Sequence, residues 1–258
     1  MVESVSLEAQ CLALPSNAAA FMYHGRCYAI KAGILVELAT ARTSCNNDMP
    51  GYVGHLSILH THELITLIKQ KMGYVDGGAW TTLERYTPSV FVYPDPSAEA
   101  GWYYQFNGKL FGPVPTRATG WANNHWYRYD AWPRYAPEVI GSQGAIFWHG
   151  SGGANVYGLL DVLVNTTWPP HCEYRESEPT FRQLITMNDQ RITDAGVFHN
   201  YTAKHLLQCI ASCAENWVCE SFGYHPQTKE CRMALTDHSD NAILYEAAPG
   251  FKFYIHNY

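Results

Sequence analysis

Aromatic and amide side chains gather between residues 102 and 132, and they are the residues of this chain best suited to recognition chemistry. Aromatic faces stack on sugars, and asparagine amides offer hydrogen bonds to hydroxyl groups. We therefore predict a surface that binds a glycan or a protein, with the following candidate ligand-binding residues: Trp121, Asn123, Asn124, Trp126, Tyr129 and Trp132. The alternative is that tryptophans such as Trp102 and Trp121 fill the core of the domain.

Catalytic chemistry has less support. The sequence has no H-E-x-x-H, G-x-S-x-G, P-loop or G-x-G-x-x-G motif. His60 and His62 lie two residues apart at an expected helix start, so they do not share a helical face, and solvated histidines at a helix entry are the simpler interpretation. Asp130 and Glu138 would suit an acid–base pair, but isolated loop carboxylates are usually solvated. We expect no catalytic residue and no enzyme activity.

Eight cysteines and two N-glycosylation sequons indicate an oxidising compartment. An even number of cysteines at module-like spacings is typical of extracellular disulfide frameworks. The sequons begin at Asn165 and Asn200, and we expect glycosylation at both. The first twenty residues lack the pattern of a signal peptide. We therefore expect an extracellular or secreted protein without its signal, or an ectodomain segment of a longer protein.

Composition narrows the choice of partners. The formal net charge of −6, without a block of like charges, argues against a nucleic-acid binder. No apolar stretch reaches the length of a transmembrane helix, so we expect no membrane span in this chain. Charged residues make up only 16% of the chain, while it has 18 tyrosines and 8 tryptophans. Such a composition is typical of proteins that bind glycans or other proteins.

Regular elements on both sides of the aromatic segment must position it. Before it, apolar spacing predicts a strand, a helix, a strand, a helix capped by Thr61 and a buried strand, at residues 25–30, 36–44, 55–59, 61–72 and 79–83. After it, the apolar runs 145–148 and 159–164 predict two further strands. The intervening chain is rich in proline and glycine, which predicts a long loop region.

This order of elements resembles a C-type lectin-like domain, over roughly residues 11–175. The matching positions are Cys27-Tyr28, Cys45 at the end of the first helix, Leu56 to Leu59, Trp80 to Leu83, and a closing segment with Asp161, Pro169 and Cys172-Glu173. The resemblance implies an α+β fold with two helices, small antiparallel sheets and a long loop region that carries the ligand site, in a domain covering 1–175. It also implies a Cys45–Cys172 disulfide, and a Cys11–Cys27 disulfide that marks the long form of the family.

Departures from the family pattern bear on calcium. Leu159-Leu160 stand where the family has Trp-Asn, and Val164 stands where it has a cysteine, so we expect a hydrophobic contact in place of the family's inner disulfide. Trp121 matches the tryptophan that precedes the calcium-and-sugar triplet, but neither Glu-Pro-Asn nor Gln-Pro-Asp occurs in the chain. Calcium takes six to eight oxygen ligands, which Asp161 alone cannot supply. We therefore expect no calcium, no other metal and no cofactor.

A second module is predicted at residues 176–258, where a polar stretch marks the boundary. Its four cysteines are spaced C-x3-C-x5-C-x11-C, within an expected helix that Thr202 caps and two strands at 220–224 and 231–235. Only the first cysteine pair has a spacing that zinc sites favour, so disulfides explain the set better than a metal does.

The second module resembles a PAN/apple domain. The resemblance is carried by Cys219-Glu-Ser-Phe-Gly-Tyr224, by Cys231-Arg-Met, and by the final strand at 250–254. It implies a helix packed on an antiparallel sheet, disulfides Cys209–Cys231 and Cys213–Cys219, and binding of proteins or carbohydrates without catalysis.

The two modules together predict an extracellular recognition or adhesion protein that binds glycans or extracellular proteins without calcium. The alternative is a structural matrix or coat component that makes only protein–protein contacts through the apple-like domain. Self-association without glycan binding would favour that alternative.

Overall fold

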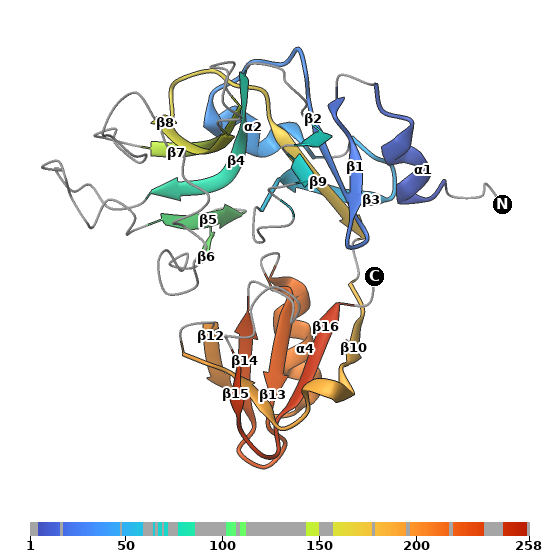
Figure 1. Ribbon diagram of the computed structural model, residues 1–258, viewed down its shortest axis with the longest axis vertical. Helices are drawn as coiled ribbons and strands as arrows, with labels where there is room; N and C mark the ends of the chain where they lie inside the picture. The colour runs from blue at the N-terminus through green and yellow to red at the C-terminus, as the bar shows by residue number, and fades with distance from the viewer. Residues whose placement is uncertain are drawn as a thin grey trace, which may run out of the picture. The chain divides into compact units, whose positions relative to one another are not determined.

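The computed structural model describes residues 5–15, 18–46, 48–58, 64, 67–68, 70–71, 77–85, 102–106, 109–111, 143–149, 157–176, 179–194, 197–216, 219–234 and 245–256 (Figure 1). A boundary between two compact units follows Ser177, where the sequence prediction placed it after Arg175. Helices are few and the sheets are small and antiparallel, so the predicted α+β fold class is confirmed.

The first sheet of the first unit is built around β9 (His171–Glu176). Its four strands follow the order β1-β2-β9-β3, with β1 (Phe21–Tyr23), β2 (Arg26–Ile30) and β3 (Tyr52–Leu56), and every pairing is antiparallel. β9 pairs with β2 on one side and β3 on the other, and its residues from His171 to Arg175 are buried. The strand that closes the unit is therefore a central, buried strand of this sheet.

The second sheet of this unit has five strands in the order β6-β5-β4-β7-β8. They are β4 (Gly77–Arg85), β5 (Trp102–Phe106), β6 (Lys109–Phe111), β7 (Gln143–His149) and β8 (Tyr157–Leu163). Trp80 of β4 joins the two sheets. It is fully buried, its backbone N–H donates to the Pro169 carbonyl at 2.8 Å, and its ring N–H donates to the Val36 carbonyl at 2.7 Å.

The helices of the first unit differ from the sequence prediction at their starts. A short helix α1 (Leu7–Leu12) was not predicted; Ser6 caps it, and its buried Leu7 and Cys11 lie one turn apart. Helix α2 (Leu38–Ser44) begins after the predicted start because Val36 and Trp168 exchange backbone hydrogen bonds of 3.2 and 3.1 Å, which hold Val36 in an extended bridge. Of the expected second helix, Leu64 and Ile68 are helical and fully buried.

Among its described residues, the second unit has a five-stranded antiparallel sheet, a two-stranded sheet and one α-helix. The sheet order is β10-β16-β13-β14-β12, with β10 (Phe181–Gln183), β12 (Val197–Thr202), β13 (Ser221–Tyr224), β14 (Glu230–Ala234) and β16 (Lys252–His256). A small second sheet pairs β11 (Gln190–Ile192) with β15 (Tyr245–Ala247), and a 3-10 turn, η3, spans Ile185–Met187. Thr202 ends β12 and does not cap the helix α4 (Leu206–Glu215); His205 caps it, with Nδ1 accepting from the Gln208 N–H at 3.2 Å.

Side chains on the two faces of this sheet build two separate cores. Phe222 and Tyr254 pack with the cysteines Cys209 and Cys213 on the α4 side. Phe253, next to Tyr254 in sequence, belongs instead to a cluster with Ile192 and Ile255. Successive residues of a strand point to opposite faces, which explains this division.

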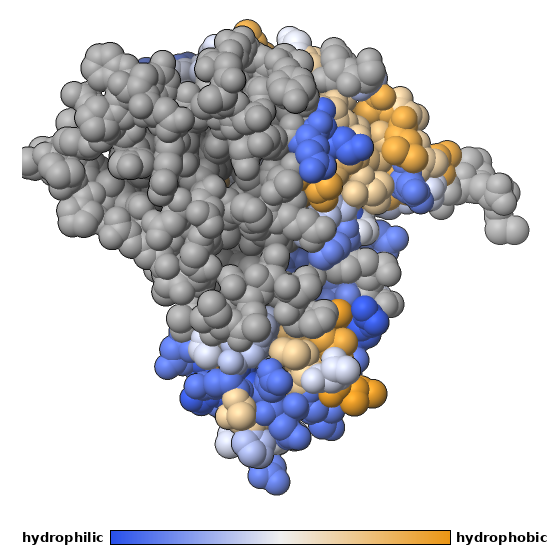
Figure 2. All heavy atoms as spheres, in the orientation of Figure 1, coloured by the Kyte–Doolittle hydropathy of each residue, from blue (hydrophilic) through white to orange (hydrophobic). Residues whose placement is uncertain are grey.

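The structure contains the four disulfides that the two resemblances implied, and each unit holds two of them. They are Cys11–Cys27, Cys45–Cys172, Cys209–Cys231 and Cys213–Cys219. Among the described residues, no helix is long and apolar enough to cross a membrane. On the face of the second unit visible in Figure 2, hydrophilic side chains predominate, and the hydrophobic ones gather at one side.

Candidate recognition site

The five-stranded sheet of the first unit holds both ends of the predicted recognition segment. Arg85, the last residue of β4, has Trp102 as its Cα partner in β5 and Gln143 as its Cα partner in β7. Antiparallel partners lie about 5 Å apart, so the backbones at Trp102 and Gln143 lie about 10 Å from each other across β4. From Trp102 the chain first forms β5 and β6, so the stretch with the candidate residues lies between Phe111 of β6 and Gln143 of β7, which belong to the same sheet.

The six candidate ligand-binding residues lie between these anchors but outside the described residues. They are Trp121, Asn123, Asn124, Trp126, Tyr129 and Trp132. Asp130, Glu138, His60 and His62, considered above for catalysis or metal binding, also lie outside the described residues. Asp161 is the Cα partner of Ala145 within the β7–β8 pair. In the described part of the chain, no three His, Cys, Asp or Glu side chains converge as a metal site would require.

A buried ion pair links β9, the last strand of the first unit, to β2. Arg26 of β2 donates to Oε1 of Glu173 in β9 at 2.6 Å, and the two residues are 2% and 0% exposed. Glu173 Oε2 also accepts from the backbone N–H of Ile58 at 3.0 Å. A buried ion pair is weak evidence for stability, but removing one partner leaves a costly buried charge. Glu173 thus fixes β2 and the segment just after β3 onto β9.

Sequence reasoning missed this pair, although its geometry follows from the strand register. Tyr28 is the Cα partner of Glu173. Arg26 lies two residues before Tyr28 in β2, so both side chains leave the same face and Arg26 reaches Glu173 diagonally. The sequence signal for this pair was a charged residue beside each strand cysteine: Arg26 before Cys27, and Glu173 after Cys172.

Two buried histidines flank Glu173. His55 of β3 has Nε2 3.9 Å from Glu173 Oε1, and its Nδ1 lies 2.6 Å from the Leu56 carbonyl. His171 of β9 has Nδ1 2.6 Å from the hydroxyl of Ser57. Burial lowers the pKa of each histidine to about 4 against a weaker opposing effect of Glu173, so both rings are neutral at neutral pH.

The contact between Ser57 and His171 has the residue types of a nucleophile and a general base. Ser57 is 0% exposed and His171 is 1% exposed, so no substrate reaches this pair in the folded unit. The Ser57 carbonyl also accepts from the Thr82 hydroxyl at 3.0 Å and from the Thr82 N–H at 3.1 Å, which ties this residue to β4. The pair therefore supports the junction of the two sheets.

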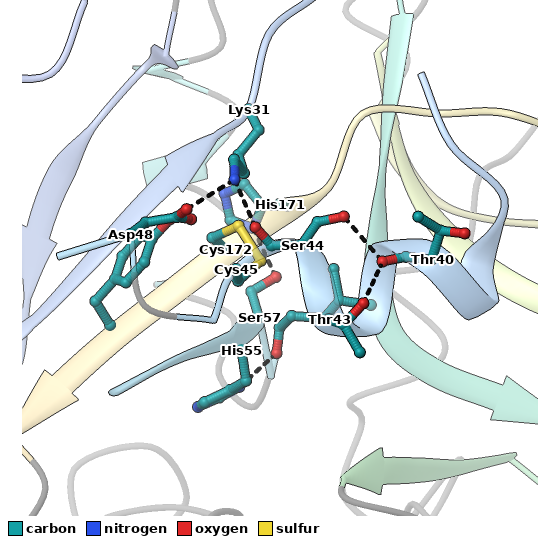
Figure 3. The surroundings of a disulfide bond; sticks show 12 residues. Lys31, Thr40, Thr43, Ser44, Cys45, Asp48, His55, Ser57, His171 and Cys172 are labelled. Atoms are coloured by element: carbon teal, nitrogen blue, oxygen red, sulfur yellow. Dashed lines mark hydrogen bonds and ion pairs between the residues drawn. A yellow bond between two sulfur atoms is a disulfide. The ribbon is translucent and has the colours of Figure 1, made fainter. Parts of the chain in front are cut away.

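A third polar cluster surrounds the Cys45–Cys172 disulfide (Figure 3). Lys31, just after β2, donates to Asp48 at 2.9 Å and to the Ser44 carbonyl at the end of α2. The other carboxylate oxygen of Asp48 accepts from the Tyr174 hydroxyl at 2.8 Å. Burial, together with Asp48, raises the pKa of Tyr174. Asp48 therefore locks the turn after α2 onto both β2 and β9.

In the second unit, polar side chains gather around Arg232 of β14. Its guanidinium, buried to 4% exposure, donates to Asp194 and, at 2.9 Å, to Glu230. The hydrogen bond from Arg232 lowers the pKa of the exposed Asp194. Arg232 is thus occupied by acidic partners of its own unit. Asn200 of β12 and Asn165, in the turn after β8, are both exposed, as glycan acceptors must be.

The chain thus has a first α+β unit whose last strand is β9. In its second unit, two disulfides link Cys209 and Cys213 of helix α4 to Cys231 and Cys219. Residues 185–257 match the family model of the PAN domain, which confirms the resemblance predicted for the second module.

The first unit is similar in fold to C-type lectin structures. CEL-IV shares 12% sequence identity, with 62% of this chain and 93% of that chain covered and a TM-score of 0.39. Human lithostathine shares 14%, covering 68% of this chain and 100% of that chain, with a TM-score of 0.39. The C-type lectin domain of murine dendritic cell inhibitory receptor 2, solved in complex with an N-glycan, shares 12%, covering 64% and 100%, with a TM-score of 0.42. No curated protein sequence matches the chain.

Proposed function

We propose that this protein is a non-catalytic extracellular recognition protein whose first unit binds glycans, without calcium, through the segment between β5 and β7. The observation that carries the proposal is the sheet order β6-β5-β4-β7-β8, because the strands before and after the candidate residues, β6 and β7, belong to this one sheet. It holds the two ends of an aromatic and amide-rich segment on one sheet. Binding residues commonly lie on loops that a rigid scaffold positions in this way.

The rigidity of that scaffold has identifiable sources. Cys45–Cys172 links α2 to β9, Glu173 links β9 to β2, and Trp80 joins the two sheets. All of these side chains are fully buried or nearly so, so they support the segment without competing for its ligand. Four disulfides fit the oxidising environment outside the cell.

Glycan binding with and without calcium tests the proposal. The full chain is applied to a glycan array in calcium and again in EDTA, and bound glycans are then titrated with the Trp126→Ala and Trp132→Ala variants. Truncating an aromatic anchor costs about 2 kcal/mol or more, so we expect affinity to fall at least about 30-fold. Leu35→Ala, which truncates an exposed apolar side chain (64% exposed) of the same unit, is the matched control.

Two results would refute this assignment. One is glycan binding that is unchanged in both tryptophan variants, which would place the ligand elsewhere. The other is binding that EDTA abolishes, together with a rise in melting temperature in calcium, which would reveal a calcium site.

A second candidate function is a structural role in which the PAN domain makes protein–protein contacts. It is favoured by two large apolar side chains on the surface of the second unit, Ile185 (75% exposed) and Leu207 (68% exposed). Sedimentation of the full chain separates the candidates. Self-association lost in Ile185→Lys or Leu207→Lys, with no glycan bound on the array, would support the structural role over recognition.

A further inference from the structure

The strand β12 combines an edge that no other described strand pairs with and a glycosylation sequon. Among the described strands, β12 pairs with β14 alone, and Figure 1 shows it at one end of the sheet. An edge strand presents free N–H and C=O groups that can pair with another chain. Six residues, Val-Phe-His-Asn-Tyr-Thr, make this strand, with no lysine, other fixed charge or proline among them.

The usual protections of an edge are therefore sparse in β12. Its register is interrupted between Val197 and His199, which is one such protection. Beyond that irregularity, four consecutive residues from His199 to Thr202 remain in register with β14. This stretch carries no fixed charge, and its Tyr201 and Thr202 are residue types that favour strands, so it is a template for pairing with a second copy of the chain.

Asn200 lies inside this regular stretch and its side chain is exposed. The neighbouring Tyr201 faces α4, where its hydroxyl donates to the Ser212 hydroxyl at 2.7 Å or to the Gln208 carbonyl at 3.2 Å. Alternation along the strand then places Asn200 and Thr202, the two sequon residues that glycosylation reads, together on the opposite face. Both are exposed.

We propose that Asn200 carries an N-linked glycan that covers the edge of β12 left open by the described strands and prevents the second unit from pairing with another copy of this chain. In the modification, the side-chain nitrogen of Asn200 bonds to the anomeric carbon of an oligosaccharide carried on a lipid pyrophosphate. The bond between that carbon and the pyrophosphate oxygen breaks, the lipid pyrophosphate leaves, and the amide proton passes to a base of the transferase. The glycan is bulky and hydrophilic, so it replaces the charges that other edge strands use.

The inference rests on the extracellular part of the proposed function, and ligand binding by the first unit can fail without affecting it. The full chain is secreted from eukaryotic cells, and glycan occupancy is read by peptide mass spectrometry before and after enzymatic glycan release. Self-association is read by sedimentation across a concentration series. The variants are Asn200→Gln and Thr202→Ala, which both remove the sequon, and Asn165→Gln, which removes the other exposed sequon from a turn.

We expect a glycan at Asn200 and a monomer for the secreted protein and for Asn165→Gln. Asn200→Gln and Thr202→Ala should self-associate at least about tenfold more tightly. Asn200→Lys removes the glycan but places a charge on the edge, so it should remain monomeric. An unmodified Asn200 in the secreted protein overturns the proposal. So does an Asn200→Gln variant that stays monomeric, or an Asn200→Lys variant that associates as strongly as Asn200→Gln.

Discussion

Acidification should destabilise the first unit through His55 and His171. Both histidines are neutral in the folded unit, with a pKa of about 4, whereas a histidine in the unfolded chain has a pKa of about 6.5. Between these values the unfolded state binds more protons than the folded state does. The stabilisation is therefore fully present above about pH 6.5 and is lost progressively as the pH falls toward 4.

The size of the effect follows from the two pKa values. Each histidine should lower the free energy of unfolding by about 2 kcal/mol between pH 7 and pH 5, and the two together by about 4 kcal/mol. That is roughly a thousandfold rise in the unfolding equilibrium constant, and a large part of the 5–15 kcal/mol that stabilises a typical domain. Charges near His55 act in both directions, because Glu173 favours its protonation while Arg175 and Arg26 oppose it. Burial therefore remains the main cause of the lowered pKa of His55.

Because the chain has two compact units, a global unfolding signal would mix their transitions. The assay must therefore report on the first unit alone. Urea titrations at pH 7 and pH 5 can be followed by hydrogen-exchange mass spectrometry on peptides that cover β3 and β9. His55→Asn and His171→Asn keep a polar atom near the Nδ1 position, which contacts the Leu56 carbonyl in one case and the Ser57 hydroxyl in the other. Each variant should halve the loss of stability, and the double variant should remove most of it.

The exposed His199 of the second unit provides the control, because His199→Asn should leave the pH dependence of the first unit unchanged. The reasoning fails if the unmodified protein loses less than about 1 kcal/mol between pH 7 and pH 5. It also fails if the double variant loses as much stability as the unmodified protein does.

Three further predictions concern the scaffold, each read by urea unfolding of the first or second unit. Arg26→Met leaves Glu173 buried without its cation and should cost about 3–5 kcal/mol, partly restored by adding Glu173→Gln; no loss in the single variant would contradict the ion pair. Gly54→Ala places a Cβ 2.1 Å from the Cys45 carbonyl oxygen and should prevent native packing. Gly33→Ala has open space around the new Cβ, so it should cost only about 1–2 kcal/mol, the cost of an L-residue at φ +89°; equal effects would refute the clash. Removing Cys45–Cys172, which closes a loop of 127 residues, should cost about 5 kcal/mol in the chain-entropy model, and removing Cys213–Cys219, with a separation of 6, about 2 kcal/mol; the reverse order would contradict the entropic account.

The sequence by itself determined the second unit more fully than the first, because the signals of the second unit are local. Cys209 and Cys213 are four residues apart, which places both on one face of a helix. The strands that follow are joined by a short turn, so β13 and β14 pair with each other through neighbouring residues. Even here the helix start was wrong, since Thr202 suits both a strand end and a helix cap, and pairing with Glu230 decided between them.

In the first unit, the sequence determined which residue types are buried, and only the tertiary structure decided which of them meet. The partners of the buried polar clusters lie far apart in the chain: 147 residues separate Arg26 from Glu173, and 114 separate Ser57 from His171. Local propensity and periodicity carry no information about such pairs, because they depend on strand register across β9. Val36 shows the same limit, since it was expected to begin a helix but forms an isolated β-bridge with Trp168. The sequence therefore supplied the recognition segment and the cysteines, and the order and register of the strands decided what holds that segment in place.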